Sequence, residues 1–129
     1  MRPRICFDID QVLATGTIEK VYSDAAGWAF EKCDLIPETL VLIEELWRRG
    51  VEIFLYSARF LEDREKTEWW LKKHVVPYDK LILGKPQSDL YIDDKNYPVA
   101  FDPKGEDHLE SILRRLHRDS PKRSRYEPR

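Results

Sequence analysis

The sequence lacks the features that would place it in several large classes of protein. It has no run near the roughly 18 apolar residues that a membrane-spanning helix needs, and it begins without a signal peptide, so no membrane partner is expected. Its two cysteines, Cys6 and Cys33, form neither a disulfide framework nor a zinc pattern. This favours the reducing cytoplasm. Cys6 lies within an apolar segment and is predicted to be a buried thiol.

The sequence also has no large excess of charge of one sign. Its 22 basic and 24 acidic residues give a net charge of -2, which excludes nucleic-acid binding by bulk charge alone. The length of 129 residues is that of one domain. Seven Arg or Lys residues against two acids are concentrated in residues 114–129. We predict a folded domain over 1–118 and a basic, flexible tail over 119–129, open to contact with an anionic partner.

Strand-like and helix-like segments alternate along the chain. Apolar patterns predict strands near residues 5–9, 51–56, 80–83 and 90–92, with a further one at 99–101, and helices at 37–49, 61–73 and 106–118. Residues 14–36 are irregular, with a weak helical pattern at 25–30. This alternation predicts an α/β fold with a parallel sheet and helices on both of its faces. Ligands of such sheets bind outside the carboxyl ends of the strands.

Polar side chains follow each of the first four predicted strands. In chain order, these residues are Asp8 and Asp10, then Ser57, Ala58 and Arg59, then Lys85, then Asp93 and Asp94. Because the carboxyl ends of parallel strands meet at one edge, we expect these side chains to converge there. The convergence indicates an active site.

The residue types indicate which chemistry this site supports. Carboxylates that meet at one point repel each other, and their unpaired burial is costly, so we expect a bound cation. Oxygen ligands without His or Cys favour magnesium, which readily binds a phosphate oxygen. Lys85 and Ser57 would supply a charge and a hydroxyl to the same phosphate. One carboxylate can attack the phosphate to give an aspartyl-phosphate, and a second can protonate the leaving oxygen and later activate water.

The same residues resemble a known family. Phe7 to Leu13, Ser57, Lys85 and the pair Asp93-Asp94 resemble, in order, the four motifs of the haloacid dehalogenase-like phosphohydrolase superfamily, over residues 4–103. More narrowly, segments 56–59, 70–79, 84–86 and 91–95 resemble small phosphatases of capsule and polysaccharide biosynthesis. The resemblance implies a three-layer Rossmann-like fold with a central parallel sheet. No insertion is long enough for a separate cap domain.

The resemblance assigns metal and proton-transfer roles to the carboxylates. Asp8 would be the nucleophile and a metal ligand. Asp10 would be the general acid and base, with its backbone carbonyl on the metal. Asp93 would complete the metal site, with Asp94 as a second ligand or support.

The remaining motif residues would contact the substrate. Ser57 would hydrogen-bond the phosphoryl group, and Lys85 would hold the phosphate and the nucleophile together. Ala58, Arg59 and Gln11 are further candidates, although Arg59 is also typical of a solvated cation at a helix start. Gln11 stands where the family usually has glycine. If that position requires a positive φ, a non-glycine residue costs about 1 kcal/mol.

These observations predict a Mg²⁺-dependent phosphatase that acts on a phosphomonoester, with sugar phosphates as the first expectation. An alternative is a phosphatase of nucleotides or polynucleotide ends, which would make nucleic acid a partner. A second alternative is a phosphate-binding or regulatory module with weak turnover, for which Gln11 is the only hint. A receiver-like domain fits poorly, because its acidic pair follows the first strand rather than the last. The sequence leaves oligomerisation open.

Overall fold

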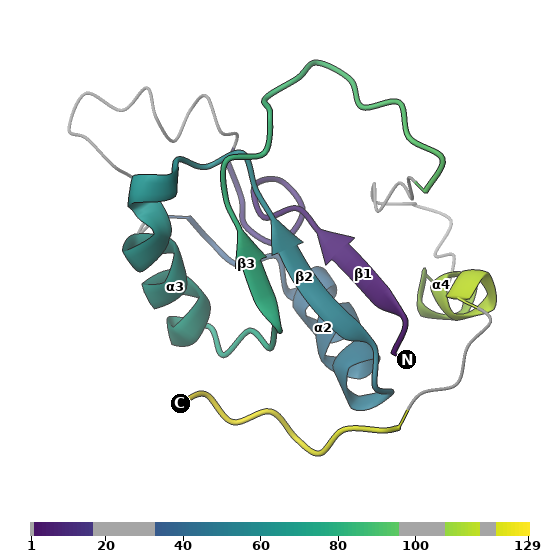
Figure 1. The fold of residues 1–129 in the computed structure, drawn as a ribbon. Helices are drawn as coiled ribbons and strands as arrows, with labels where there is room; N and C mark the ends of the chain where they lie inside the picture. The colour runs from purple at the N-terminus through teal and green to yellow at the C-terminus, as the bar shows by residue number, and fades with distance from the viewer. Residues whose placement is uncertain (1, 17–32, 96–107, 117–120) are drawn as a thin grey trace.

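Three parallel strands form the sheet of this computed structural model, which describes residues 2–16, 33–95, 108–116 and 121–129 (Figure 1). The strands are β1 (Arg4–Phe7), β2 (Glu52–Tyr56) and β3 (Lys80–Ile82), paired in the order β1-β2-β3. The predicted parallel α/β sheet is therefore confirmed for these strands. All three carboxyl ends lie at the same edge of the sheet.

The two faces of the sheet differ in burial because successive side chains of a strand point to opposite faces. Phe7, Ile53 and Leu55 are buried on one face, in a core shared with the helices. Phe54 lies on the other face and is only partly buried, and Cys6, on the same face, is exposed. The prediction of a buried Cys6 thiol is therefore wrong. Because side chains of a strand alternate between the two faces, Cys6 lies on the face of the sheet that the described helices do not cover.

The first described helix, α2 (Pro37–Arg48), begins where the sequence predicts and ends one residue earlier than predicted. Pro37 takes the first helical position, where its missing N–H is not needed. After the helix, Gly50 has a φ of 85°, and the N–H groups of Gly50 and the next residue bond to the carbonyls of Trp47 and Leu46. This is a Schellman ending, in which glycine avoids the steric cost of the left-handed conformation.

The predicted second helix is formed by a 3₁₀ turn, η2 (Leu61–Asp63), followed by α3 (Arg64–Lys73). Trp70 is fully buried, and its indole Nε1 donates to the carbonyl of Cys33 at 3.0 Å. The helix ends with the same pair of Schellman bonds as α2, but the glycine position is occupied by Val75, with a φ of 54°. A β-branched residue in this conformation is strained.

The predicted fourth strand, at residues 90–92, is not formed. These residues lie on an irregular loop, 84–95, in which Leu90 is 74% and Ile92 93% exposed. Parallel neighbours need a connection of about a dozen residues or more. Only the seven residues 83–89 separate this apolar run from β3.

The predicted three-layer arrangement is seen only in part. Within the described ranges, the core that α2 and α3 share with the sheet lies on one face of it. The helical pattern at 25–30 and the further strand at 99–101 fall outside these ranges. The architecture of the described residues is therefore α/β and Rossmann-like, with an open sheet of three parallel strands.

The last predicted helix is present as α4 (His108–Leu116). Ile112 joins the core, and the helix contacts α2 on the β1 side of the sheet (Figure 1). Among the described helices, none combines the length and the apolar character needed to cross a bilayer.

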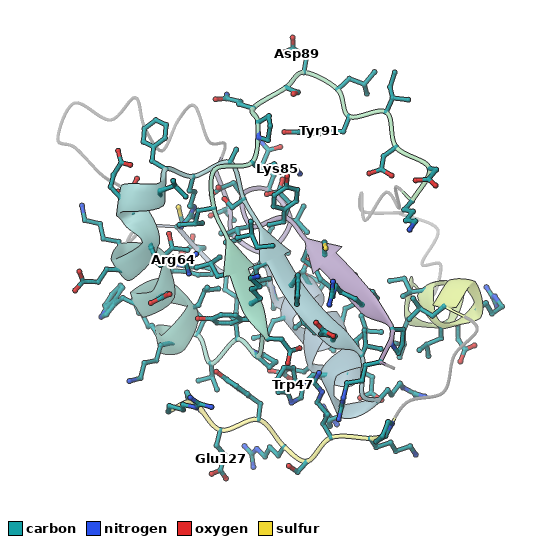
Figure 2. All side chains as sticks on the ribbon, in the orientation of Figure 1. Trp47, Arg64, Lys85, Asp89, Tyr91 and Glu127 are labelled. Carbon is teal, nitrogen blue, oxygen red and sulfur yellow. The ribbon has the colours of Figure 1, made fainter. Side chains whose placement is uncertain are left out.

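The C-terminal segment 121–129 makes specific contacts, although we predict a flexible tail. Arg123 bonds to both carboxylate oxygens of Asp79, at 2.9 and 3.0 Å, and lies 3.8 Å from the ring centre of Trp47. Tyr126 packs edge-on against the same ring, and the two border a hollow of about 430 Å³. Figure 2 shows Trp47 at the end of the sheet opposite Lys85, so the segment is attached far from the strands' carboxyl ends.

Candidate active site

The turn after β1 holds the first two carboxylates in a rigid backbone. The N–H groups of Leu13 and Ala14 both bond to the carbonyl of Ile9, at 2.8 and 2.9 Å. Gln11 closes the turn with a φ of 69°, and its N–H bonds to the Ala14 carbonyl at 2.7 Å. The sequence raised the question of whether the position of Gln11 requires a positive φ, and the structure has a positive φ there, at a residue that is not glycine. Asp10, just before it, is only 9% exposed.

The ends of β2 and β3 remain hydrogen-bonded beyond the strands themselves. The Lys85 N–H bonds to the Ser57 carbonyl at 2.9 Å, and the Gly84 N–H bonds to the Arg59 carbonyl at the same distance. Ser57 is fully buried. The backbones that carry the hydroxyl and the lysine are therefore fixed relative to one another.

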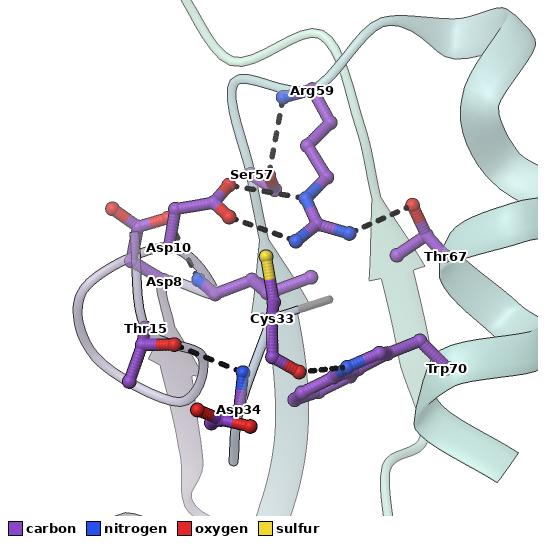
Figure 3. A network of polar contacts seen from close by, with 10 residues as sticks. Asp8, Asp10, Thr15, Cys33, Asp34, Ser57, Arg59, Thr67 and Trp70 are labelled. Carbon is purple, nitrogen blue, oxygen red and sulfur yellow. Dashed lines mark hydrogen bonds and ion pairs between the residues drawn. The ribbon is translucent and has the colours of Figure 1, made fainter. Parts of the chain in front are cut away.

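Arg59 and Asp10 form a buried ion pair at the centre of the site (Figure 3). The Arg59 Nε donates to Asp10 Oδ2 at 3.1 Å, and its Nη2 donates to Oδ1 at 2.8 Å. Its Nη1 reaches Thr67 Oγ1, on α3, at 3.3 Å. The backbone N–H of Arg59 donates to Ser57 Oγ at 3.1 Å. The pair therefore connects the turn after β1 to β2 and α3.

Asp8 lies beside this network and is half-buried. One of its oxygens accepts the Ile9 N–H at 2.8 Å. Burial raises the pKa of Asp8, and the charge of Asp10 raises it further. The Ile9 hydrogen bond and the positive charges of Lys85 and Arg59 act in the opposite direction, with a smaller effect on that pKa. The two carboxylates and the two cations therefore share one electrostatic environment.

Lys85 follows β3 and its ammonium group lies close to two aromatic rings. Its Nζ is 5.1 Å from the ring centre of Tyr56 and 4.3 Å from that of Tyr91. The Tyr91 hydroxyl donates to the Pro86 carbonyl, which holds the second ring over the lysine. Figure 2 shows Lys85 and Tyr91 at the carboxyl end of the sheet. Ring faces attract a cation, so these contacts hold the ammonium group near this edge.

The structure does not bring the last two predicted metal ligands to the site. Asp93 and Asp94 are exposed on the 84–95 loop, and an Asp93 oxygen accepts the Lys95 N–H at 2.8 Å. In the part of the chain that the structure describes, no cluster of three or more His, Cys, Asp or Glu side chains could hold a metal ion. The predicted four-carboxylate magnesium site therefore does not fit this arrangement of the loop.

The predicted substrate-binding residues other than Ser57 and Lys85 fall into two groups. Gln11 is exposed and Ala58 half-buried at the edge of the sheet, where a ligand could reach them. Arg59 is 0% exposed and bonds to Asp10, so it does not take the predicted role of a substrate contact here. Sequence reasoning missed the contact between Arg59 and Thr67. Helical periodicity places Thr67 on the inner side of its helix, but does not indicate its partner.

Comparison with known sequences gives no assignment. No protein-family profile matches the chain. No curated protein matches it either.

Comparison with solved structures shows the fold. A structure of the Pnkp1/Rnl/Hen1 complex matches with a TM-score of 0.54 at 24% identity, over 72% of this chain and 30% of the other. One of the Pnkp1/Rnl/Hen1 RNA repair complex matches with a TM-score of 0.53 at 22% identity, over 76% of this chain. The chain spans 28% of the length of that second structure. A Vibrio cholerae crystal structure matches with a TM-score of 0.59 at 20% identity, over 88% of this chain and 98% of the other. The chain shares its α/β fold with these proteins.

Proposed function

We propose that the protein is a phosphomonoesterase of the haloacid dehalogenase-like type, in which Asp8 is the nucleophile. The observation that carries this proposal is the position of Asp8 beside the buried Asp10, with Ser57 and Lys85 at the same edge of a parallel sheet. This is the edge at which such folds bind ligands. The order of these residues matches the motifs that the sequence resembles.

The chemistry has two steps. Asp10 first takes up a proton from solvent, since its carboxylate is paired with Arg59 in this structure. An Asp8 oxygen then attacks phosphorus, the bond from phosphorus to the ester oxygen breaks, and the departing oxygen takes that proton from Asp10. Water then attacks the phosphorus of the aspartyl-phosphate and gives a proton back to Asp10, which releases inorganic phosphate and free Asp8. The Lys85 ammonium would stabilise the negative charge on the phosphoryl oxygens in both steps.

Magnesium remains part of the proposal as a cofactor, on the basis of its preference for oxygen donors. Asp8 and the backbone carbonyl of Asp10 would be donors at the end of β1. Asp93 and Asp94 would join them only with the 84–95 loop in another position. When bound, a divalent cation supplies positive charge to the phosphoryl group and favours the ionised form of Asp8.

Two substrate classes have specific support. One of the similar solved structures is named as the Pnkp1/Rnl/Hen1 RNA repair complex, and another is named as a Pnkp1/Rnl/Hen1 complex, which favours phosphorylated ends of nucleic acid. The exposed Phe60 and Tyr91, at the carboxyl ends of the strands, offer rings on which a base could stack. Sugar phosphates rest only on the narrower sequence resemblance to capsule phosphatases. We therefore place nucleic-acid ends first.

The test is phosphate release from a panel of 3′- and 5′-phosphorylated oligonucleotides, nucleotides and sugar phosphates, with Mg²⁺ or with EDTA. We expect release with Mg²⁺ from the oligonucleotides and none with EDTA. The matched control is Asp8→Asn, which should release no phosphate from any substrate. Release confined to sugar phosphates would reverse the order of the two classes. No release from any substrate, with phosphate binding intact, would favour the regulatory module instead.

A further inference from the structure

We infer that Arg59 is a positioning residue that fixes the carboxylate of Asp10 for proton transfer. The inference rests on the proposed function, since it assigns a task to a residue behind the acid and base of that reaction. The guanidinium bonds to both Asp10 oxygens, at 2.8 and 3.1 Å. Two parallel bonds from a planar group fix the plane of the carboxylate as well as its position.

Arg59 is itself held from several sides. Its Nη1 bonds to Thr67 Oγ1, its N–H to Ser57 Oγ, and its carbonyl to the Gly84 N–H. Both Arg59 and Thr67 are 0% exposed. The guanidinium therefore cannot turn towards a substrate without breaking the contacts that place it. Its orientation is set by α3 and by the ends of two strands.

This geometry leaves Asp10 able to exchange a proton. A carboxylate has about four lone-pair sites, two on each oxygen, and the fork occupies one site on each. A second site on each oxygen remains for a proton moving to the leaving group or from water. Lysine cannot replace this fork, because its ammonium is a point charge without a fixed plane. The turn at residues 9–14 fixes the other end of Asp10 through its backbone.

Two other roles for Arg59 predict different kinetics. A substrate contact would mainly raise KM when removed. A purely structural ion pair would lower the rates on all substrates alike, in proportion to the folded fraction. A residue that acts through Asp10 should matter most where the leaving group needs a proton.

The experiment compares two phosphate esters. One is 4-nitrophenyl phosphate, whose phenolate leaves without a proton, and the other is an alkyl phosphate, whose alkoxide needs one. The variants are Arg59→Lys, Arg59→Met, Thr67→Val and Asp10→Asn. Arg49→Met, at the exposed residue that follows α2, is the matched control. The quantity compared is kcat/KM, which includes only the steps up to phosphoryl transfer to Asp8.

We expect both Arg59 variants to lower kcat/KM on the alkyl ester by about 100-fold, within the usual range for general acid catalysis. On the nitrophenyl ester, kcat/KM should change by less than about 3-fold. Its kcat should nevertheless fall, with a burst of nitrophenolate, because Asp10 also activates water in the second step. Adding Arg59→Met to Asp10→Asn should cause no further loss, since both act through one group. Arg49→Met should match the wild type.

Equal losses of kcat/KM on both esters, or a rise in KM alone, would overturn the inference. Should the Arg59 variants not fold, Thr67→Val carries the test, because it loosens the guanidinium and keeps its charge. That variant should lower kcat/KM on the alkyl ester by about 5- to 10-fold and change it little on the nitrophenyl ester, and equal losses on both esters would contradict the inference. A wild-type protein that hydrolyses neither of these esters nor any substrate of the phosphorylated panel would refute the proposed function itself, and the inference with it.

Discussion

The Arg59 guanidinium lies wholly inside the protein and bonds to both carboxylate oxygens of Asp10, at 2.8 and 3.1 Å. The two residues are 49 positions apart in the chain, so their contact joins the first turn of the fold to the end of β2. Because one partner is 0% and the other 7% exposed at the side chain, neither charge can be left alone without a large cost.

The first prediction concerns the stability that depends on this pair. Arg59→Met removes the cation and leaves the Asp10 charge buried, so the free energy of unfolding should fall by about 3–5 kcal/mol. Urea unfolding at pH 7 measures this change. The double variant Arg59→Met with Asp10→Asn should recover a large part of the loss. A loss below about 1 kcal/mol in the single variant would mean that the pair opens to solvent.

The second prediction concerns Asp8 and the pH dependence of stability. Burial raises the pKa of this carboxyl in the folded protein, so ionised Asp8 destabilises the fold. The cost is absent at a pH below the ordinary carboxyl pKa, where the group is protonated in both states, and it appears as the pH rises through the folded pKa. Without metal, Asp8→Asn should therefore melt at a higher temperature than the wild type at pH 7, and at the same temperature near pH 3. It should also be inactive.

The control for this measurement is Asp89→Asn, on the exposed loop, which should melt like the wild type at both pH values. A stability gain in Asp8→Asn that persists unchanged at pH 3 would contradict the electrostatic cause. Wild-type turnover in Asp8→Asn would show that the nucleophile assignment is wrong.

The sequence predicts the elements that carry their own local signals. The helix predicted at 37–49 has a proline at its start, a periodic apolar face and a glycine at its end, and the structure has it at Pro37–Arg48. The strand at 52–56 forms beside β1 because both are short apolar runs with a helix between them. The run at 90–92 has a strand-like composition, but its connection is too short for parallel pairing with β3.

The site is predictable in its residue types and less so in its contacts. Position after a strand predicts that the Asp8 turn, Ser57 and Lys85 share one edge, as the structure has them. The same rule also predicts Asp93 and Asp94 there, and these lie exposed on the 84–95 loop. Nothing local in the sequence indicates which cation pairs with which carboxylate. Arg59 could therefore be taken for a substrate contact, although the fold buries it against Asp10.

The third prediction concerns the two strained non-glycine residues. Val75 and Gln11 have φ values of 54° and 69°, where a side chain costs about 1–2 kcal/mol. Glycine removes this strain but loses about 0.5–1 kcal/mol through its freedom in the unfolded chain. Val75→Gly should therefore stabilise the protein by about 1 kcal/mol, and Gln11→Gly by less, because β-branched residues suffer most in this conformation.

Chemical denaturation measures both changes, with Gly50→Ala as the opposite control at the equivalent end of α2. That variant should be destabilised by about 1 kcal/mol or more. If Val75→Gly is destabilised as well, contacts of the valine side chain outweigh the strain of its backbone.

The fourth prediction concerns the C-terminal segment. Deleting residues 119–129 removes the two bonds between Arg123 and Asp79 and the contacts with Trp47, so the protein should lose about 1–2 kcal/mol of stability. The rate on a small phosphate ester should not change, because these contacts lie at the amino ends of the strands. Arg123→Met should reproduce most of the stability loss. A large loss of rate in a fully folded deletion variant would show that the segment reaches the site.

The central claim is that Asp8 receives the phosphoryl group, and one measurement tests it directly. The protein is mixed with a phosphorylated substrate, quenched in acid during turnover and reduced with borohydride, which converts an aspartyl-phosphate into homoserine. Peptide mass spectrometry then locates the modified residue. The account predicts homoserine at position 8 in the wild type and none in Asp8→Asn. Phosphate release without modification of Asp8, or homoserine at another aspartate, would contradict it.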